Sequence, residues 1–249
     1  VERYLQHLQV VKNASEHTIR NYSNDLKALL VFLNTKKDVN DITKSLLREF
    51  LADLSEQKLA RRSIVRRLSA IRSFFSYLHK EQIISANPMS EIESPKLERK
   101  IPISLTYEQV QNLFSQPDTS DFMGMRDRSI LELFYSSGLR VSELVALSRH
   151  DFDFEKLEMR LHGKGRKVRV VPITKNAADW VQRYMAHPSH KSKTDAIFLN
   201  RFLGRLTTRS VDRLFEKYLK ASGLAAHITP HIIRHTIATH WLENGMDLK

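Results

Sequence analysis

The stretch from Ala86 to Ser104, ANPMSEIESPKLERKIPIS, constrains the fold of this chain more than any other segment. It contains Pro88, Pro95 and Pro102, and its charged residues interrupt any helical or strand-like hydrophobic period. Proline lacks a backbone donor and disfavours helical geometry in the residue before it. The stretch is therefore predicted to hold a linker, at residues 91–104, between a domain at residues 1–90 and a second at residues 105–249.

The two parts differ in their hydrophobic pattern. Residues 1–80 are helical in pattern, with Ser15 and Thr43 as N-caps of two of the helices. After the linker, helical patterns flank two segments around the glycines of GKGR: residues 157–163 alternate in hydropathy, and residues 167–173 are rich in β-branched residues. Such an arrangement is typical of a β-hairpin. The predicted fold class is thus mainly α with a small β-sheet, an all-helical domain followed by an α+β domain.

One predicted helix, from Lys58 to Lys80, carries seven Lys and Arg residues and no Asp or Glu. At about 100° per residue its hydrophobic side chains form one narrow stripe, and Arg62 and Arg66 project from the opposite side. Since the helix has no acidic partner of its own, we expect these arginines to bind an external anion, best matched by DNA. A solvated basic face is the alternative. The residues predicted to contact DNA are Lys44, Lys58, Arg61, Arg62, Arg66, Arg67, Arg166, Lys167 and Arg209.

Overall composition agrees with a nucleic-acid partner. The chain has 40 Lys and Arg against 28 Asp and Glu, a formal net charge of +12, which favours association with a polyanion. It has no cysteine, which excludes disulfides and thiolate zinc sites and fits a reducing cytoplasm. No hydrophobic run approaches the roughly 18 residues that a membrane span needs, so no membrane association is predicted.

Four residues are candidates for chemistry. Arg234 lies in the hydrophobic arc of the last helix, which has no carboxylate one turn away, so it needs an anion from elsewhere. Arg140 follows the helix-ending Gly138. Lys164 lies at the hairpin tip between two glycines, and His231 lies one turn before Arg234. Three of them also have a simpler interpretation: a structural Asp or Glu as the partner of Arg234, a helix dipole that Arg140 complements, and plain solvation of Lys164.

A metal site is a weaker interpretation of the last helix. His231 and His235 share a helix face, but no Glu follows the first His as in HExxH metalloproteases. We therefore predict no metal and no cofactor, with a metal-dependent nuclease as the alternative. Two arginines, a lysine and a histidine favour metal-free phosphoryl transfer, in which the arginines bind phosphate oxygens and the lysine and histidine move protons.

Three motifs, GLRVSEL, GKGRKVRVVPI and PHIIRHTIATHWLENGMDL, resemble in order and spacing those of the tyrosine recombinase (phage integrase) family, and residues 15–33 resemble its Xer-type members. The resemblance implies a SAM-like core-binding domain and a catalytic domain that form a C-shaped clamp on DNA. By position, it assigns the two catalytic arginines to Arg140 and Arg234, the hairpin lysine to Lys164 and the histidine of H-x-x-R to His231.

In this family a tyrosine attacks DNA, leaving a 3′-phosphotyrosyl bond and a free 5′ hydroxyl that later reverses the step. The resemblance implies double-stranded DNA as partner, a homo- or hetero-tetramer on two recombination sites, and possible contact with a cell-division DNA translocase. It further implies a cytoplasmic, nucleoid-associated protein that resolves chromosome dimers. A mobile-element integrase with the same chemistry and a non-catalytic DNA-binding protein of the same fold are the alternatives.

The nucleophile itself has no match in the sequence. In the family, the tyrosine and a preceding His or Trp follow the position of NGMDL, whereas the seven tyrosines of this chain all precede Arg234. Tyr135 and Tyr218 lie among Leu and Phe and are expected to be core residues. We therefore expect the 249-residue chain to bind DNA without cleaving it.

Overall fold

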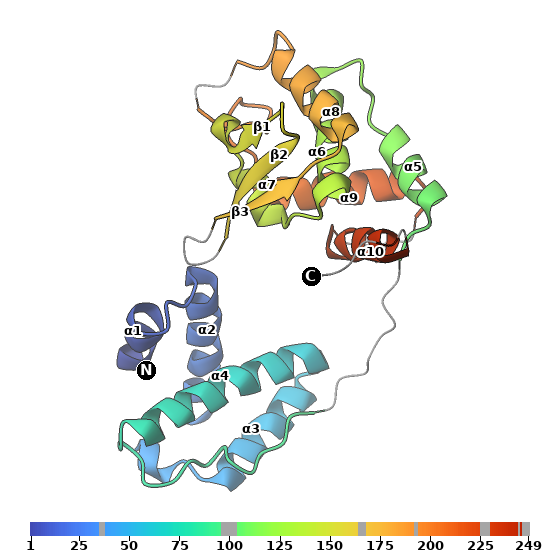
Figure 1. Ribbon diagram of the computed structural model, residues 1–249. Helices are drawn as coiled ribbons and strands as arrows, with labels where there is room; N and C mark the ends of the chain where they lie inside the picture. Colours follow the sequence, from blue (N-terminus) through green and yellow to red (C-terminus); the bar gives the residue numbers. More distant parts are fainter. Residues whose placement is uncertain are drawn as a thin grey trace. The chain divides into compact units, whose positions relative to one another are not determined.

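The computed structural model describes residues 1–34, 38–95, 104–163, 168–191, 194–224, 230–243 and 245, with the side chains of Pro230 and His231 excepted. The chain divides into two compact units, Val1–Lys100 and Ile101–Lys249 (Figure 1). The first is helical, and the second combines helices with one three-stranded sheet. The predicted fold class, mainly α with a small β-sheet, is confirmed. Among the described residues, no helix is long and hydrophobic enough to cross a membrane.

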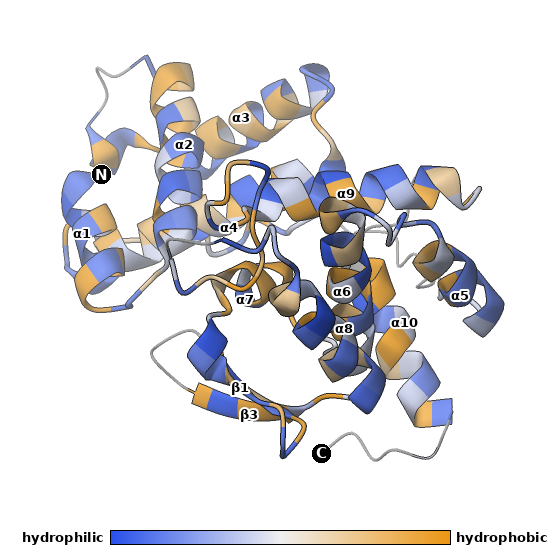
Figure 2. Cartoon of the chain, turned by 90° about the horizontal axis from the view of Figure 1, so that it is seen from above, coloured by the Kyte–Doolittle hydropathy of each residue, from blue (hydrophilic) through white to orange (hydrophobic). Residues whose placement is uncertain are grey.

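The described residues of the first unit form the α-helices α1 (Glu2–Val10), α2 (Glu16–Phe32), α3 (Lys44–Glu56) and α4 (Arg61–Lys80), with a 3₁₀ turn at Val39–Asp41. The predicted N-caps are present, since the hydroxyls of Ser15 and Thr43 accept from backbone N–H groups three residues ahead. The helices are two-sided in hydropathy (Figure 2), and their hydrophobic sides, including Leu26, Phe50 and Phe75, form the core.

The first unit extends past its predicted end at residue 90. Met89 and Ile92 are 1% and 6% exposed and belong to its core. The guanidinium of Arg72 donates to the Ile92 carbonyl over 2.8 Å, which holds this segment on α4. Regular structure in the first unit thus ends with α4 at Lys80, whereas its packing continues past Pro88. Helix α4 also begins three residues later than predicted, because Lys58 has a left-handed backbone (φ 55°) that an α-helix cannot continue.

The second unit holds the remaining elements. Its helices are α5 (Tyr107–Ser115), α6 (Phe122–Ser137), α7 (Val141–Ala146), α8 (Lys175–Ala186), α9 (Thr208–Ala221) and α10 (Pro230–Glu243), with a 3₁₀ turn at Arg149–Asp151. The sheet has the order β1 (Phe152–Asp153), β2 (Glu158–His162) and β3 (Val168–Pro172), and all its pairs are antiparallel. The predicted hairpin is β2–β3; the two-residue β1 is too short to have given a sequence pattern.

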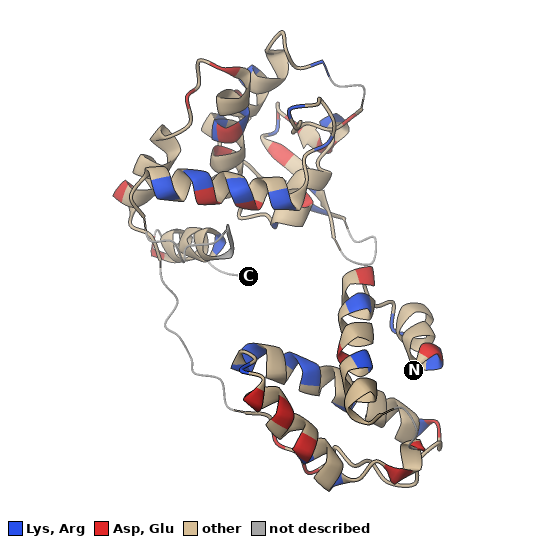
Figure 3. Cartoon of the chain, turned by 180° about the vertical axis from the view of Figure 1, so that it is seen from behind, with Lys and Arg blue, Asp and Glu red and all other residues tan. Residues whose placement is uncertain are grey.

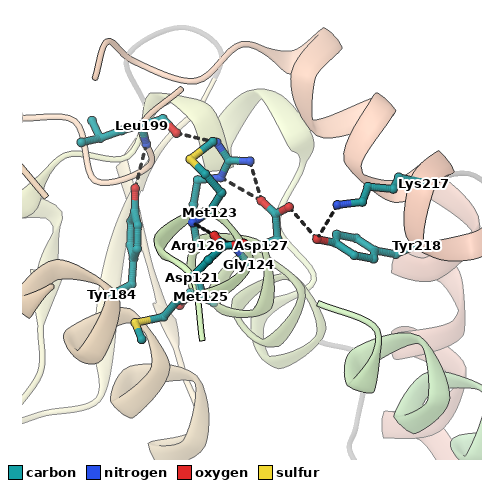
Figure 4. A network of polar contacts seen from close by, with 11 residues as sticks. Asp121, Met123, Gly124, Met125, Arg126, Asp127, Tyr184, Leu199, Lys217 and Tyr218 are labelled. Atoms are coloured by element: carbon teal, nitrogen blue, oxygen red, sulfur yellow. Dashed lines mark hydrogen bonds and ion pairs between the residues drawn. The ribbon is translucent and has the colours of Figure 1, made fainter. Parts of the chain in front are cut away.

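Helix α6 lies at the centre of this unit and is buried on most of its surface, between α8 and α10 (Figure 1). It carries a buried polar network, shown in Figure 4. Arg126 donates to Asp127 and, over 2.7 Å, to the Leu199 carbonyl, and the hydroxyl of Tyr218 donates to Asp127 over 2.9 Å. Each buried charge therefore has a partner, which ties α9 and the loop after α8 to the central helix.

Candidate functional site

The site begins at the turn between α6 and α7. Gly138 ends α6 in a left-handed conformation (φ 55°), which glycine adopts without a steric cost. The turn makes Arg140 the N-cap of α7, and the backbone N–H of Arg140 donates to Oε2 of Glu143 over 2.7 Å. The motif GLRVSEL therefore spans the end of α6, a tight turn and the capped start of α7. This turn places Arg140 at the exposed N-terminal end of α7.

Glu143 is the centre of the site, although sequence reasoning did not nominate it. Its side chain is only 5% exposed, and four nitrogen atoms lie within 3.1 Å of its two oxygens. Two belong to Arg140, its backbone nitrogen and Nη1; the other two are Nη1 and Nη2 of Arg169, at 2.8 and 2.9 Å. Burial alone raises the pKa of Glu143, but the hydrogen bonds from Arg169 and Arg140 together outweigh it and lower the pKa. Glu143 is thus a buried, ionised carboxylate shared by two arginines.

Arg234 reaches the same turn from α10. Its Nη1 donates to the carbonyl oxygen of Gly138, two residues before Arg140. Burial, followed by repulsion from Arg140 and then from Arg169, lowers the pKa of Arg234, and the negative charge of Glu143 partly offsets this. In the described part of the chain, no carboxylate forms an ion pair with Arg234. The two arginines predicted from the sequence are therefore brought together.

The charges in this site are unbalanced. Three arginines (140, 169 and 234) surround one glutamate, so three positive charges face one negative charge and an excess of two remains. The side chains of Arg140 and Arg169 are 61% and 41% exposed, whereas the carboxylate lies inside. Guanidinium groups present a planar set of donors that suits phosphate oxygens. The site is thus suited to bind an anion, and a phosphodiester in particular.

Some predicted site residues lie outside the described residues. They are Lys164, Arg166 and Lys167, in the connection between β2 and β3. The backbone of His231 lies in the first turn of α10, one turn before Arg234, but its side chain also lies outside the described part. Their roles stay predictions.

The remaining histidines of α10 give no metal cluster. His235 is exposed, while His240 contacts the hydroxyl of Tyr135 and the carbonyl of Leu105, both at 2.9 Å. Among the residues that the structure describes, no group of three or more His, Cys, Asp or Glu is placed to hold a metal ion.

The basic helix α4 differs from expectation in one respect. Arg66 and Arg67 do have an acidic partner, Asp25 of α2, whose side chain is 1% exposed. The sequence of α4 contains no sign of this pair, because Asp25 belongs to another helix. Arg61 and Arg62 are exposed, and within the described residues neither forms an ion pair. Figure 3 shows Lys and Arg at the start of α4 and several acidic residues on α3.

The other predicted DNA contacts lie at separate places. Lys44, at the start of α3, forms an ion pair with Glu91, and Lys58 is exposed just before α4. In the second unit, Arg209 is exposed in the first turn of α9. The geometry gives each of them access to solvent and leaves their contact with DNA as a prediction.

Two family models match the chain. Residues 104–249 match the phage integrase family, and residues 1–82 match the phage integrase N-terminal SAM-like domain. The chain belongs to the phage integrase family. Similar relatives of this family include two proteins named tyrosine recombinase XerC: that of Chlamydia caviae is 47% identical and that of Chlamydia pneumoniae 46% identical, each over 99% of this chain and 86% of the relative. The chain thus belongs to a family of tyrosine recombinases, whose activity is site-specific recombination.

Solved structures of integrases share the fold. A Tn1549 transposon integrase in complex with circular intermediate DNA has a TM-score of 0.80, with 18% identity over 98% of this chain and 86% of that one. The XerH site-specific recombinase bound to a palindromic difH substrate has a TM-score of 0.79, with 21% identity over 99% of this chain and 74% of that one.

Proposed function

We propose that this tyrosine recombinase cuts and rejoins double-stranded DNA through a 3′-phosphotyrosyl intermediate, with Arg140 and Arg234 bound to the non-bridging oxygens of the scissile phosphate. The observation that carries the proposal is the excess of positive charge around the buried carboxylate of Glu143. Because these arginines are held before DNA arrives, they can stabilise the charge that develops on a pentavalent phosphorus without further reorganisation.

The proposed reaction conserves the number of phosphoester bonds. A tyrosine oxygen bonds to phosphorus, the 5′ oxygen leaves and takes a proton, and a 5′ hydroxyl of the partner duplex later displaces the tyrosine. Lys164 would protonate the departing 5′ oxygen, and His231 would assist proton transfer beside Arg234. Bond energy is retained in the phosphotyrosyl ester, so no external energy source is required.

The attacking tyrosine must occupy the sequence position of the family's nucleophile. Tyr184 is fully buried and accepts from the Leu199 N–H, and burial raises its pKa to about 12. Burial raises the pKa of Tyr218 too, and its hydroxyl is bonded to Asp127. Neither hydroxyl is placed to attack DNA. We propose that cleavage requires a tyrosine at the family's position, after NGMDL.

The proposed biological role is resolution of chromosome dimers, with a homo- or hetero-tetramer acting on two sites in the nucleoid, in contact with a division-linked DNA translocase. The XerC names of the relatives support this role over that of a mobile-element integrase. Deleting the gene tests it: cells should accumulate dimeric chromosomes at division, and expression of the intact gene should restore their separation. Normal chromosome separation in the deletion strain would favour a mobile-element integrase.

A further inference from the structure

Arg169 enters the site from the sheet, outside both arginine motifs. In β3 it lies opposite Leu161 of β2, which is 1% exposed, so it shares the core-facing side of the hairpin. Its neighbours Val168 and Val170 are 54% and 55% exposed, on the outer side. The Arg169 side chain is 41% exposed, yet its guanidinium reaches inward to the buried carboxylate of Glu143, with which it forms an ion pair.

The two arginines use Glu143 differently. Arg169 directs both of its terminal nitrogens, Nη1 and Nη2, at the two carboxylate oxygens. Arg140 directs one terminal nitrogen, Nη1, at Oε1, and its side chain is more exposed, at 61% against 41%. The fork of Arg169 is therefore committed to the carboxylate, while Arg140 keeps its second terminal nitrogen for a ligand.

The charges lead to the same division of roles. Without Arg169, Glu143 and Arg140 would form a pair of zero net charge, which attracts a phosphate weakly. With Arg169, the three residues keep one positive charge, to which Arg234 adds another. Because the charge of Arg169 offsets that of Glu143, the positive charge of Arg140 can attract a phosphate.

We propose that Arg169 is a positioning residue of the recombinase site: it neutralises and fixes Glu143, so that Arg140 can bind the scissile phosphate. The inference rests on the proposed function, in which Arg140 contacts that phosphate.

The test is a double-mutant cycle in a form of the protein that carries the family's tyrosine. It uses a nicked duplex containing the target sequence, obtained by selection from a random pool. Arg169→Gln should slow strand cleavage by at least about tenfold, and Arg169→Lys, which keeps the charge, should restore part of the rate. In a Glu143→Gln background, Arg169→Gln should cost no more than about threefold, because its partner is already neutral. If the effects of the two single variants multiply, Arg169 acts independently of Glu143 and the proposal is wrong.

A second readout does not depend on cleavage. In the 249-residue chain, an NMR titration of the Glu143 carboxyl should show its pKa rising in Arg169→Gln, since that arginine helps to lower it. An unchanged pKa would overturn the proposal even if cleavage were impaired.

Two controls separate the possible failures. Arg160→Gln removes an exposed arginine on the outer side of the same hairpin, opposite Val170, and should leave the cleavage rate unchanged. Arg140→Ala tests the proposed function itself. If Arg140→Ala cleaves normally, the proposed function fails; if it is inactive while Arg169→Gln keeps the wild-type rate, only the role of Arg169 fails.

Discussion

The backbone N–H of Leu105 donates a buried hydrogen bond of 3.0 Å to the hydroxyl of Thr236, 131 residues further along the chain. The Leu105 carbonyl is bonded in turn to Nε2 of His240 at 2.9 Å. A carbonyl can only accept, so Nε2 carries the proton, and in the neutral ring Nδ1 accepts from the Tyr135 hydroxyl. The first residues of the second unit are thus fixed to α10, the helix that carries Arg234.

Thr236→Val should destabilise the second unit. The substitution keeps the side-chain shape but leaves the buried Leu105 N–H without its acceptor, which costs about 1–3 kcal/mol. Urea unfolding followed by circular dichroism measures the loss. Thr239→Val is the matched control, because the Thr239 hydroxyl donates to the His235 carbonyl of its own helix. Equal losses in the two variants would contradict a stabilising role for the contact with Leu105.

Arg62→Ala should weaken DNA binding without affecting the fold. Arg62 is exposed and, within the described residues, has no acidic partner, so its loss should lower the salt-dependence slope of log affinity by about 0.9. Arg66→Ala should lower the slope similarly and also reduce stability, since buried Asp25 then loses one of its two arginines. Fluorescence anisotropy at several salt concentrations measures the slope. An unchanged slope in both variants would remove α4 from the DNA interface.

Glu143 should contribute an acid-sensitive part of the stability. Its folded-state pKa lies below the ordinary value of 4.5, so the unfolded chain takes up the proton first as the pH falls. The contribution is complete above pH 4.5 and is lost as the pH falls through the lowered pKa. Glu143→Gln should therefore be less stable than wild type at pH 7, with a difference that shrinks at acid pH. Urea unfolding at several pH values measures this, with exposed Glu155→Gln as the control for the charge change. A difference independent of pH would contradict the prediction.

The helices and the two motif arginines could be predicted because their signals are local. Ser15 and Thr43 cap helices within four residues of themselves, and Arg140 and Arg234 stand out against the pattern of their own segments. Strand β2 likewise shows the period of two in consecutive residues, since Met159 and Leu161 are buried and Arg160 between them is exposed.

The partners of the arginines could not be predicted in the same way, because each comes from another element. Asp25 lies 41 residues before Arg66, and Glu143 lies 26 residues before Arg169. The sequence around Arg169 gave no signal for its role, because it alternates with Val168 and Val170 and would be assigned to the polar side of the strand. The pairing of β2 with β3 places it opposite Leu161, on the core-facing side of the hairpin. The identity of its anion depends on how α7 packs against the sheet, which no local pattern contains.

Trapping of a covalent complex tests the account most directly. A form of the protein that carries the family's tyrosine is incubated with a nicked target duplex, from which the cleaved strand diffuses away, and the product is resolved under denaturing conditions. We expect wild type to form a protein–DNA adduct joined at the 3′ phosphate. Arg140→Ala and Arg234→Ala should form it at least about 100-fold more slowly while still binding the duplex. Adduct formation by either variant at the wild-type rate would contradict the assignment of these arginines to the scissile phosphate, and no adduct from wild type would indicate a non-catalytic DNA-binding protein.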